Sequence, residues 1–363
     1  MKKTILVTLS IILVLSGICF PMQIKLIKVI QIPKELLFVS GYFAVLEDGK
    51  FIFADIRDKN NQIKIFNENG QLEKSWGKMG PGPEEFDGLG YLDYQPPFLA
   101  IADAGKRKIY LFEISGNGEF LKLGEIGAWE MNGPIKIYDK NKLLITGYIV
   151  SSDNRGYAVF MRDLLGKDTR YVLPNEYKFG AKSEGEHKRI FEEVRGLSWL
   201  SYLEVLEDTA FYISSVRLKV VKIDLKSGRI ESFGKTPNNF RPLSMDRRTR
   251  EALVDPRKGK ETQEKMFDSC SFVSGLFADK EFVGIIYVNR EKKIGNEKYF
   301  VPYVQLYNHS GKPLHTLPLA SFYSEENFIP LFYNRKDRLL YLCSILYKED
   351  AIQYTLYKYK IEP

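Results

Sequence analysis

Two stretches of the sequence carry the same pattern: FIFADIRDKNNQIKIF at residues 51–66 and LAIADAGKRKIYLF at residues 99–112. Each begins with an apolar run that ends in Ala-Asp, passes through a polar turn, and returns as an alternating run ending in Phe. This pattern predicts two antiparallel strands joined by a turn. The two aspartates, Asp55 and Asp103, lie 48 residues apart. That spacing is typical of propeller blades rather than of helical solenoid repeats.

The hairpin pattern recurs in four later segments, residues 142–160, 210–224, 281–307 and 339–359. A single hairpin cannot bury both of its faces, whereas blades packed around a shared axis can. We therefore predict an all-β fold, a six-bladed β-propeller of four-stranded antiparallel blades. The last unit reaches the end of the chain without a fourth strand. We predict that the alternating run at residues 23–30 supplies it and closes the ring, because closure removes a frayed edge.

The composition agrees with a folded, strand-rich domain. The chain has 363 residues, of which 44% are hydrophobic and 27% charged, and it contains 22 Tyr and 24 Phe. These values exclude wholesale disorder, and aromatic residues at this density favour pleated sheet. Two segments, residues 183–194 and 244–254, break the strand pattern. We predict that they form short helical insertions between blades.

The first nineteen residues are predicted to be a signal peptide, and residues 20–363 the propeller. Lys2 and Lys3 precede an apolar run over residues 5–15, which is typical of secretion signals and short for a membrane span. The predicted location is therefore extracytoplasmic, either periplasmic or secreted. Two alternatives remain at this point: a lipoprotein anchored through Cys19, and an uncleaved N-terminal anchor.

Charge and cysteine content indicate which partners to expect. The formal charge is +7, and it falls to +5 when the signal peptide leaves, because Lys2 and Lys3 are lost with no acidic residue. A mildly basic, mixed surface without a concentrated basic stripe argues against nucleic-acid binding. We predict a monomer that meets a membrane only through its N-terminal signal or a lipid anchor. Cys270 and Cys343 lie in apolar runs and are predicted to be buried thiols, with a disulfide as the alternative.

A glycine-rich linker, GKMGPGPEEF at residues 77–86, lies between the first two hairpins. Residues 101–112 resemble an NHL repeat, and residues 51–66 resemble a looser copy of it. The linker resembles that of bacterial exported six-bladed β-propellers of the NHL-repeat and TolB-like family. Glu84 stands where the family linker usually has glycine. The resemblance implies the propeller fold. It leaves the function open, because propellers support both binding and catalysis.

The predicted turns supply the candidate binding residues. Asp55 and Arg57 lie in the first turn, and Asp103, Lys106 and Arg107 in the second. The aspartates could contact a ligand at the channel mouth, or accept backbone hydrogen bonds within their own turns. The basic residues could form a rim for an anionic ligand. Arg248 and Arg250, in the second helical segment, could reach a carboxylate or phosphate.

No catalytic pattern is present in the sequence. His187, His309 and His315 are not spaced as zinc ligands, and no Gly-x-Ser-x-Gly elbow occurs. We therefore predict an exported binding or scaffold protein for a protein, peptide or glycan ligand, with no cofactor. The alternative is a calcium-dependent hydrolase or lyase with oxygen ligands near the central channel.

Overall fold

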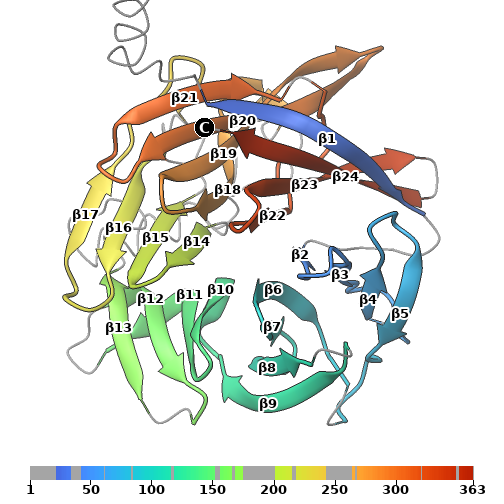
Figure 1. The fold of residues 1–363 in the computed structure, drawn as a ribbon, viewed down its shortest axis with the longest axis vertical. Coiled ribbons are helices and arrows are strands. Elements are labelled where there is room, and N and C mark those ends of the chain that lie inside the picture. Colours follow the sequence, from blue (N-terminus) through green and yellow to red (C-terminus); the bar gives the residue numbers. More distant parts are fainter. Residues whose placement is uncertain are drawn as a thin grey trace, which may run out of the picture.

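The computed structural model describes residues 22–33, 42–60, 62–82, 85–115, 118–151, 156–165, 168–174, 201–214, 218–242, 264–265, 268–319, 321–348 and 351–362. These residues form six four-stranded antiparallel sheets arranged around a common axis (Figure 1). The predicted six-bladed propeller is confirmed. No helix within the described ranges is long and apolar enough to cross a membrane.

The first three blades follow the chain from the centre outward. Blade 1 comprises β2 (Phe43–Val45), β3 (Phe51–Ala54), β4 (Ile63–Phe66) and β5 (Leu72–Trp76). Blade 2 comprises β6 (Leu89–Gln95), β7 (Phe98–Asp103), β8 (Lys108–Ile114) and β9 (Phe120–Gly127). Blade 3 comprises β10 (Met131–Asp139), β11 (Lys142–Val150), β12 (Gly156–Asp163) and β13 (Thr169–Pro174).

Blades 4 and 5 repeat this order, and blade 6 combines both ends of the chain. Blade 4 comprises β14 (Ser201–Leu206), β15 (Thr209–Ser214), β16 (Val220–Asp224) and β17 (Ile230–Phe233). Blade 5 comprises β18 (Phe272–Ala278), β19 (Phe282–Ile294), β20 (Glu297–Asn308) and β21 (Pro313–Pro318). Blade 6 comprises β22 (Leu331–Asn334), β23 (Leu339–Lys348), β24 (Ala351–Glu362) and β1 (Gln23–Ile32).

Blade 6 joins the two ends of the ring. β1 pairs antiparallel with β24, from Gln23 opposite Glu362 to Ile32 opposite Tyr354. β1 is therefore the outermost strand of the blade whose other three strands come from the C-terminus (Figure 1). The alternating run at residues 23–30 lies within this strand. Neighbouring inner strands contact one another all the way round the axis.

The six hairpins predicted from sequence are the second and third strands of the six blades. These two strands are sandwiched within and between blades, so their residues are mostly buried, as in β7 and β8. The outer strand β9, by contrast, is largely exposed. Blades pack through apolar clusters; one cluster joins Ile52 and Ile65 of blade 1 to Leu99 and Ile101 of blade 2.

The glycine-rich linker is held at the interface of blades 1 and 2. Phe86 is buried, and its ring centroid lies 5.8 Å from that of Trp76 and 5.7 Å from that of Tyr110. Phe86 therefore anchors the linker. Gly77 adopts a φ of +76°, and a Cβ there would lie 2.6 Å from the Phe86 ring.

Other sequence predictions have clear outcomes. Cys270 and Cys343 are buried and free, so the disulfide alternative is wrong. Trp76 packs against the apolar cluster between blades 1 and 2, whereas Trp129 is 70% exposed. Trp129 follows the outer strand β9, where no further strand covers it. The predicted helical segments 183–194 and 244–254 lie outside the described residues, and short helical turns at 264–265 and 268–269 lie between β17 and β18.

Candidate functional site

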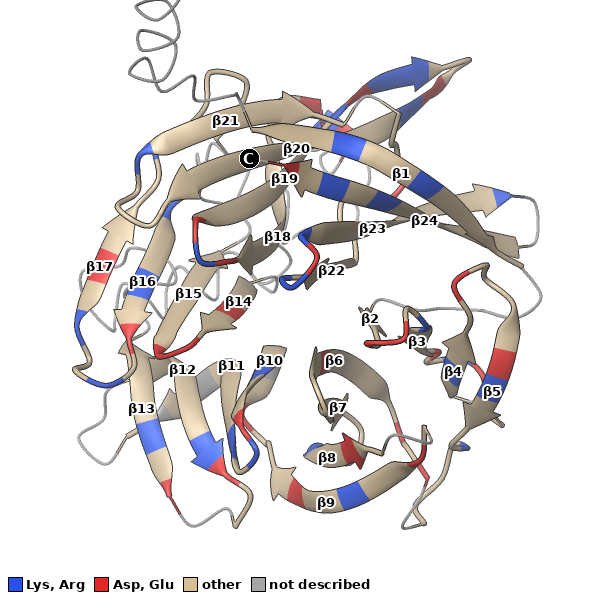
Figure 2. Cartoon of the chain, viewed as in Figure 1, with Lys and Arg blue, Asp and Glu red and all other residues tan. Residues whose placement is uncertain are grey.

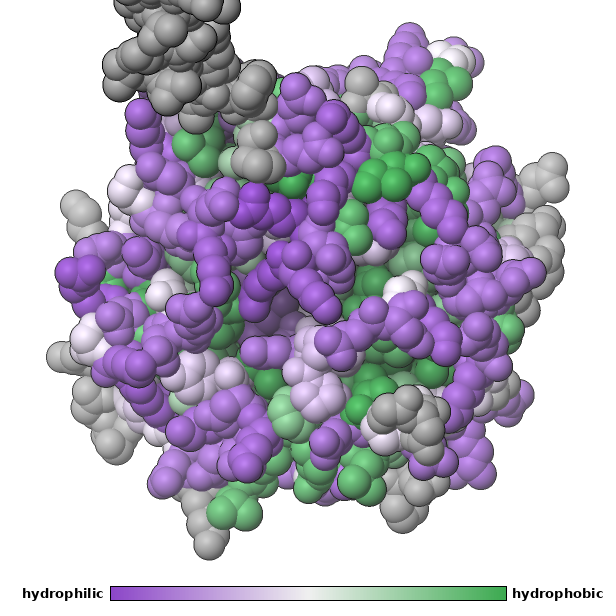
Figure 3. All heavy atoms as spheres, in the orientation of Figure 1, coloured by the Kyte–Doolittle hydropathy of each residue, from purple (hydrophilic) through white to green (hydrophobic). Residues whose placement is uncertain are grey.

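A cavity opens at the central axis of the described structure. It has a volume of about 310 Å³ and is lined by the inner strands of five blades, namely β2, β6, β10, β14 and β22. The lining residues cluster at the C-terminal ends of these strands and in the turns that follow. Figure 3 shows one face of the disc hollowed near its centre, with hydrophilic residues around the hollow. We call this opening the channel mouth.

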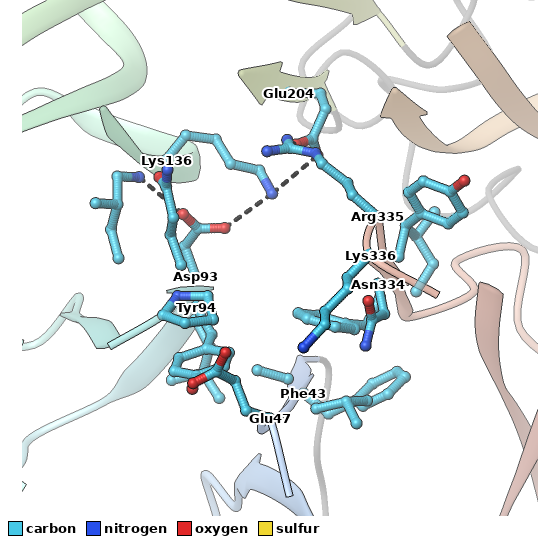
Figure 4. Close-up of a pocket in the computed structure, with 18 of the residues that line it drawn as sticks. Phe43, Glu47, Asp93, Tyr94, Lys136, Glu204, Asn334, Arg335 and Lys336 are labelled. Carbon is cyan, nitrogen blue, oxygen red and sulfur yellow. Dashed lines mark hydrogen bonds and ion pairs between the residues drawn. The ribbon is translucent and has the colours of Figure 1, made fainter. Parts of the chain in front are cut away.

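A buried ion ladder crosses the channel mouth. Lys136 of β10 lies between two carboxylates: its Nζ is 2.8 Å from Asp93 Oδ1 of β6 and 3.0 Å from Glu204 Oε2 of β14 (Figure 4). Asp93 also accepts a 2.7 Å hydrogen bond from the backbone N–H of Ile137. Three neighbouring blades are thus joined by one ammonium group.

Arg335 extends the ladder across the channel. It follows β22 in blade 6, and its guanidinium donates to Glu204 and to the backbone carbonyl of Val205. Its Nε donates to the carbonyl oxygen of Ala278 at 3.1 Å. Arg335 therefore connects blade 6 to blades 4 and 5, and the complete ladder involves five of the six blades.

The pKa values of the two carboxyl groups in the ladder are shifted in opposite directions. Burial raises the pKa of Asp93 above its usual value, with Lys136 opposing and Glu204 reinforcing the shift. Glu204 is also buried, which opposes ionisation, but Lys136 and Arg335 together hold its pKa below the usual value. Asp93 has one cationic partner and Glu204 has two. Both carboxylates raise the pKa of Lys136 although its burial acts in the opposite sense.

The outer rim of the mouth carries two charges that the ladder does not use. Glu47 follows β2 of blade 1, and Lys336 follows Arg335 in the neighbouring blade 6 (Figure 4). Both are exposed, and neither has an ion-pair partner among the described residues. Glu47 acts on Tyr94, whose pKa is raised to about 12 by burial first and by this charge second.

The wall between the rim and the ladder is largely apolar. Phe43, Leu92, Phe332 and the ring of Tyr94 contribute to it. Below the ladder, a smaller cavity of about 80 Å³ continues along the axis and includes Tyr42, Tyr91 and Tyr202 in its lining. The channel therefore passes from a charged rim, along apolar and ionic walls, to a tyrosine-lined end.

The turn residues predicted from sequence lie on the other face of the disc. Their turns join second to third strands, whereas the mouth is formed by turns between first and second strands. Asp55 is buried, accepts a 2.8 Å hydrogen bond from Lys64 Nζ, and caps the N–H of Arg57. Arg57 itself is exposed. A contact of either Asp55 or Arg57 with a ligand stays a prediction.

The second predicted turn is bound into the linker. Asp103 is buried and accepts hydrogen bonds from the N–H groups of Asp87 and Lys106, each at 3.0 Å. Lys106 Nζ donates to the carbonyl oxygens of Gly82 and Glu85. These contacts hold the linker on blade 2. Asp103 therefore accepts backbone hydrogen bonds, which was the alternative to ligand contact that the sequence left open.

The remaining sequence candidates divide into described and undescribed residues. Arg107 places its guanidinium carbon 4.5 Å from the centre of the exposed Trp129 ring. Arg248, Arg250 and His187 lie outside the described residues, so their roles stay predictions. His309 Nε2 lies 2.7 Å from the carbonyl oxygen of Asp279 in a turn of blade 5.

Sequence reasoning missed the ladder. Asp93, Lys136 and Glu204 each stand alone between apolar neighbours, in Leu-Asp-Tyr, Ile-Lys-Ile and Leu-Glu-Val. A single charge in the middle of a strand was therefore the available signal. It is not specific, because Lys64 occupies another Ile-Lys-Ile and forms its ion pairs with Asp55 and Asp58, away from the channel. Only the closed ring brings the three strands together.

The ladder does not fit the calcium site that the sequence left as an alternative. The Lys136 ammonium occupies the position between Asp93 and Glu204 where a cation would need both carboxylates. Calcium binds six to eight oxygen atoms, and a fixed ammonium repels it. The described ranges also contain no cluster of three or more His, Cys, Asp or Glu side chains arranged for a metal.

Comparison with known proteins identifies the fold alone. No protein-family model and no well-characterised sequence matches the chain. A solved structure of a Bacteroides fragilis protein predicted to be exported is similar, with a TM-score of 0.57 and 13% identity, covering 94% of this chain and 96% of that one. The structure of U3-55K gives a TM-score of 0.48 and 11% identity, covering 91% and 98%. A luciferin-regenerating enzyme gives 0.46 and 10%, covering 92% and 96%.

Proposed function

We propose that this protein is an exported binding propeller that captures a peptide segment of a partner protein in the channel mouth. One observation supports the proposal above the others: the cavity of about 310 Å³ has apolar walls and carries at its rim two opposite charges without ion-pair partners among the described residues, Glu47 of blade 1 and Lys336 of the neighbouring blade 6. Concave sites with apolar walls and a few polar groups are the usual form of a ligand site.

The chemistry of the mouth favours a peptide over the other ligand classes. A peptide offers a charged group of either sign, a backbone with donors and acceptors, and apolar side chains for the walls. A neutral glycan would have no use for two opposite rim charges. Nucleic acid would find no concentrated positive charge here, because Lys136 and Arg335 are paired with Asp93 and Glu204, and Glu47 offsets Lys336.

The ladder supports the proposal by fixing the shape of the site. Lys136 and Arg335 hold inner strands of five blades in place. The walls therefore need little rearrangement when a ligand enters, and a preformed site loses less conformational entropy on binding.

The test is selection of peptides on the propeller itself. A chain beginning at residue 20, which retains every described residue, is immobilised and panned against a displayed random-peptide library. Enriched peptides are then titrated by fluorescence anisotropy. Reversing a rim charge by Lys336→Glu or Glu47→Lys is expected to weaken at least one class of enriched peptide about tenfold, which corresponds to about 1.4 kcal/mol.

Lys312→Glu is the matched control. Lys312 is an exposed lysine in the turn between β20 and β21, at the outer edge of blade 5. It makes the same charge change away from the channel, and affinity is expected to stay within about twofold of wild type. Peptides that bind all variants equally, or a library that yields no enrichment, would refute the proposal.

We further propose that the protein is exported, which rests on its N-terminal sequence. We also propose that it is related to NHL-repeat or TolB-like propellers, which rests on the linker and residues 99–112. The similar Bacteroides fragilis protein supports the fold on which this relationship depends. Mass spectrometry of the product from an expressing bacterium tests export. A mature N-terminus near residue 20 supports cleavage, a diacylglyceryl mass on Cys19 indicates a lipoprotein, and an intact Met1 in the cytoplasm contradicts export.

A further inference from the structure

The outer strand of blade 6 exposes an unusual run of apolar side chains. Within four residues of β1, Leu26 is 42% exposed, Ile27 53% and Val29 47%. Large aliphatic side chains grouped on a surface strand are unfavourable in water and mark contact surfaces.

A β-bulge lies within this apolar run. The register between β1 and β24 shifts between Leu26 and Lys28, so Ile27 has no partner on β24. Leu26 lies opposite Tyr359 and Val29 opposite Tyr357. The extra residue bends the strand and turns Ile27 outward, while the alternation of the strand is otherwise kept.

The same strand pair carries a concentration of lysines. Lys25 lies directly opposite Lys360, and Lys28 directly opposite Lys358. Figure 2 shows the corresponding bands along β1 and β24. Like charges placed directly opposite each other destabilise an antiparallel pair. Part of this cost is offset within the protein, because Lys25 forms an ion pair with Glu362 and Lys28 donates to the carbonyl oxygen of Glu68 and to Asn69 Oδ1. The remaining excess of positive charge beside the apolar run favours an anionic, partly apolar partner.

The sequence before β1 indicates what that partner is. The apolar run of residues 5–15 and Cys19 immediately precede the strand. From Cys19 to Gln23 an extended chain spans at most about 14 Å. A lipid anchor at Cys19 or an uncleaved N-terminal anchor would attach this segment to a bilayer. In either case β1 is held beside that bilayer.

We propose that the outer edge of blade 6 docks on the surface of an anionic lipid bilayer through β1. Leu26, Ile27 and Val29 enter the headgroup region, and the positive charge of Lys28, Lys358 and Lys360, which no carboxylate among the described residues neutralises, attracts lipid phosphates. Apolar insertion combined with lysine attraction is the general basis of peripheral membrane binding. This inference is independent of peptide binding in the channel, which lies at the centre of the disc.

Vesicle co-sedimentation tests the proposal. The chain beginning at residue 20 is used, because the N-terminal apolar run would bind vesicles on its own. We expect partition onto vesicles of phosphatidylcholine with about one quarter phosphatidylglycerol to exceed partition onto pure phosphatidylcholine about tenfold or more, and to fall with added salt. Ile27→Asp is expected to lower partition about tenfold, and Lys28→Glu about fivefold.

Leu121→Asp provides the matched control. Leu121 is 62% exposed on β9, the outer strand of blade 2, across the ring from β1 (Figure 1). It tests whether any exposed outer-strand aliphatic residue contributes, and its partition is expected to equal that of wild type. Circular dichroism verifies folding, and Ile27→Ser replaces Ile27→Asp if the charged variant does not fold.

Three results would overturn the proposal. The first is no binding to anionic vesicles by the wild-type chain. The second is an equal loss in Leu121→Asp and Ile27→Asp. The third is a dimer in size-exclusion chromatography with light scattering that Ile27→Asp dissociates, because the strand would then be covered by a second copy of the chain. Peptide binding is measured on the same variants and is expected to be unchanged.

Discussion

Replacing Lys136 by methionine removes the cation that joins Asp93 and Glu204. The two carboxylates are about one tenth exposed, and Lys136 Nζ lies 2.8 and 3.0 Å from their oxygens. Methionine keeps most of the side-chain volume, so the main change is the loss of charge. Removing one partner of a buried ion pair costs about 3–5 kcal/mol. Because Lys136 is 23% exposed to the channel, we expect a loss of about 3 kcal/mol, at the lower end.

The loss depends on pH, and its direction follows from the carboxyl groups. Burial already raises the pKa of Asp93, and without Lys136 that shift is opposed mainly by the hydrogen bond from the Ile137 N–H, while Glu204 loses one of its two cations. Both pKa values therefore rise in the folded variant. The folded variant then binds more protons than its unfolded chain between the ordinary and the raised values, so its stability falls as pH rises through that window. The deficit relative to wild type is expected to be larger at about pH 7.5 than at about pH 5.

The assay is equilibrium urea unfolding of the chain beginning at residue 20, followed by tryptophan fluorescence and circular dichroism. Lys142→Met is the control: Lys142 lies on β11 and makes an exposed 3.9 Å pair with Asp139, so its loss should be under about 1 kcal/mol. The double variant Lys136→Met/Asp93→Asn is expected to recover about half of the loss, because it removes the Asp93 carboxylate that has lost its cationic partner. A deficit below about 1 kcal/mol, or one that does not change with pH, would refute the reasoning.

Three further predictions concern positions away from the ladder. Phe86→Ala should cost about 3–4 kcal/mol in urea unfolding, because it empties the site that anchors the linker; a loss below about 1 kcal/mol would contradict that anchoring role. Gly70→Ala should lower the melting temperature clearly more than Gly49→Ala: both glycines have φ near +80°, but a Cβ at Gly70 would lie 2.5 Å from the Gln31 carbonyl oxygen and one at Gly49 meets open space. Equal effects would show that the contact with β1 is unimportant. Burial raises the pKa of Cys270 to about 12, so a thiol reagent at mildly alkaline pH should label it only after unfolding; rapid labelling of the folded chain would contradict its burial.

Local pattern predicted the hairpins but neither the inner nor most of the outer strands. β7 and β8 are buried over most of their length, so their sequences are continuously apolar and easily recognised. The inner strand β2 has only three residues, which is too short for a period-two pattern. The outer strand β9 is mostly exposed, so its mixture of leucine, lysine and glutamate carries little signal. β1 is the exception, because its alternation was recognised as a strand left without a hairpin.

The sequence by itself determined the hairpins, their repeat and the strand available at the N-terminus, because each depends on residues close together in the chain. Only the tertiary structure decided which charges meet at the axis. Asp93, Lys136, Glu204 and Arg335 are spread over more than two hundred residues, and ring closure alone brings them within hydrogen-bond distance. The tertiary structure likewise set lysine against lysine across β1 and β24, since the pairing of the two chain ends fixes that register.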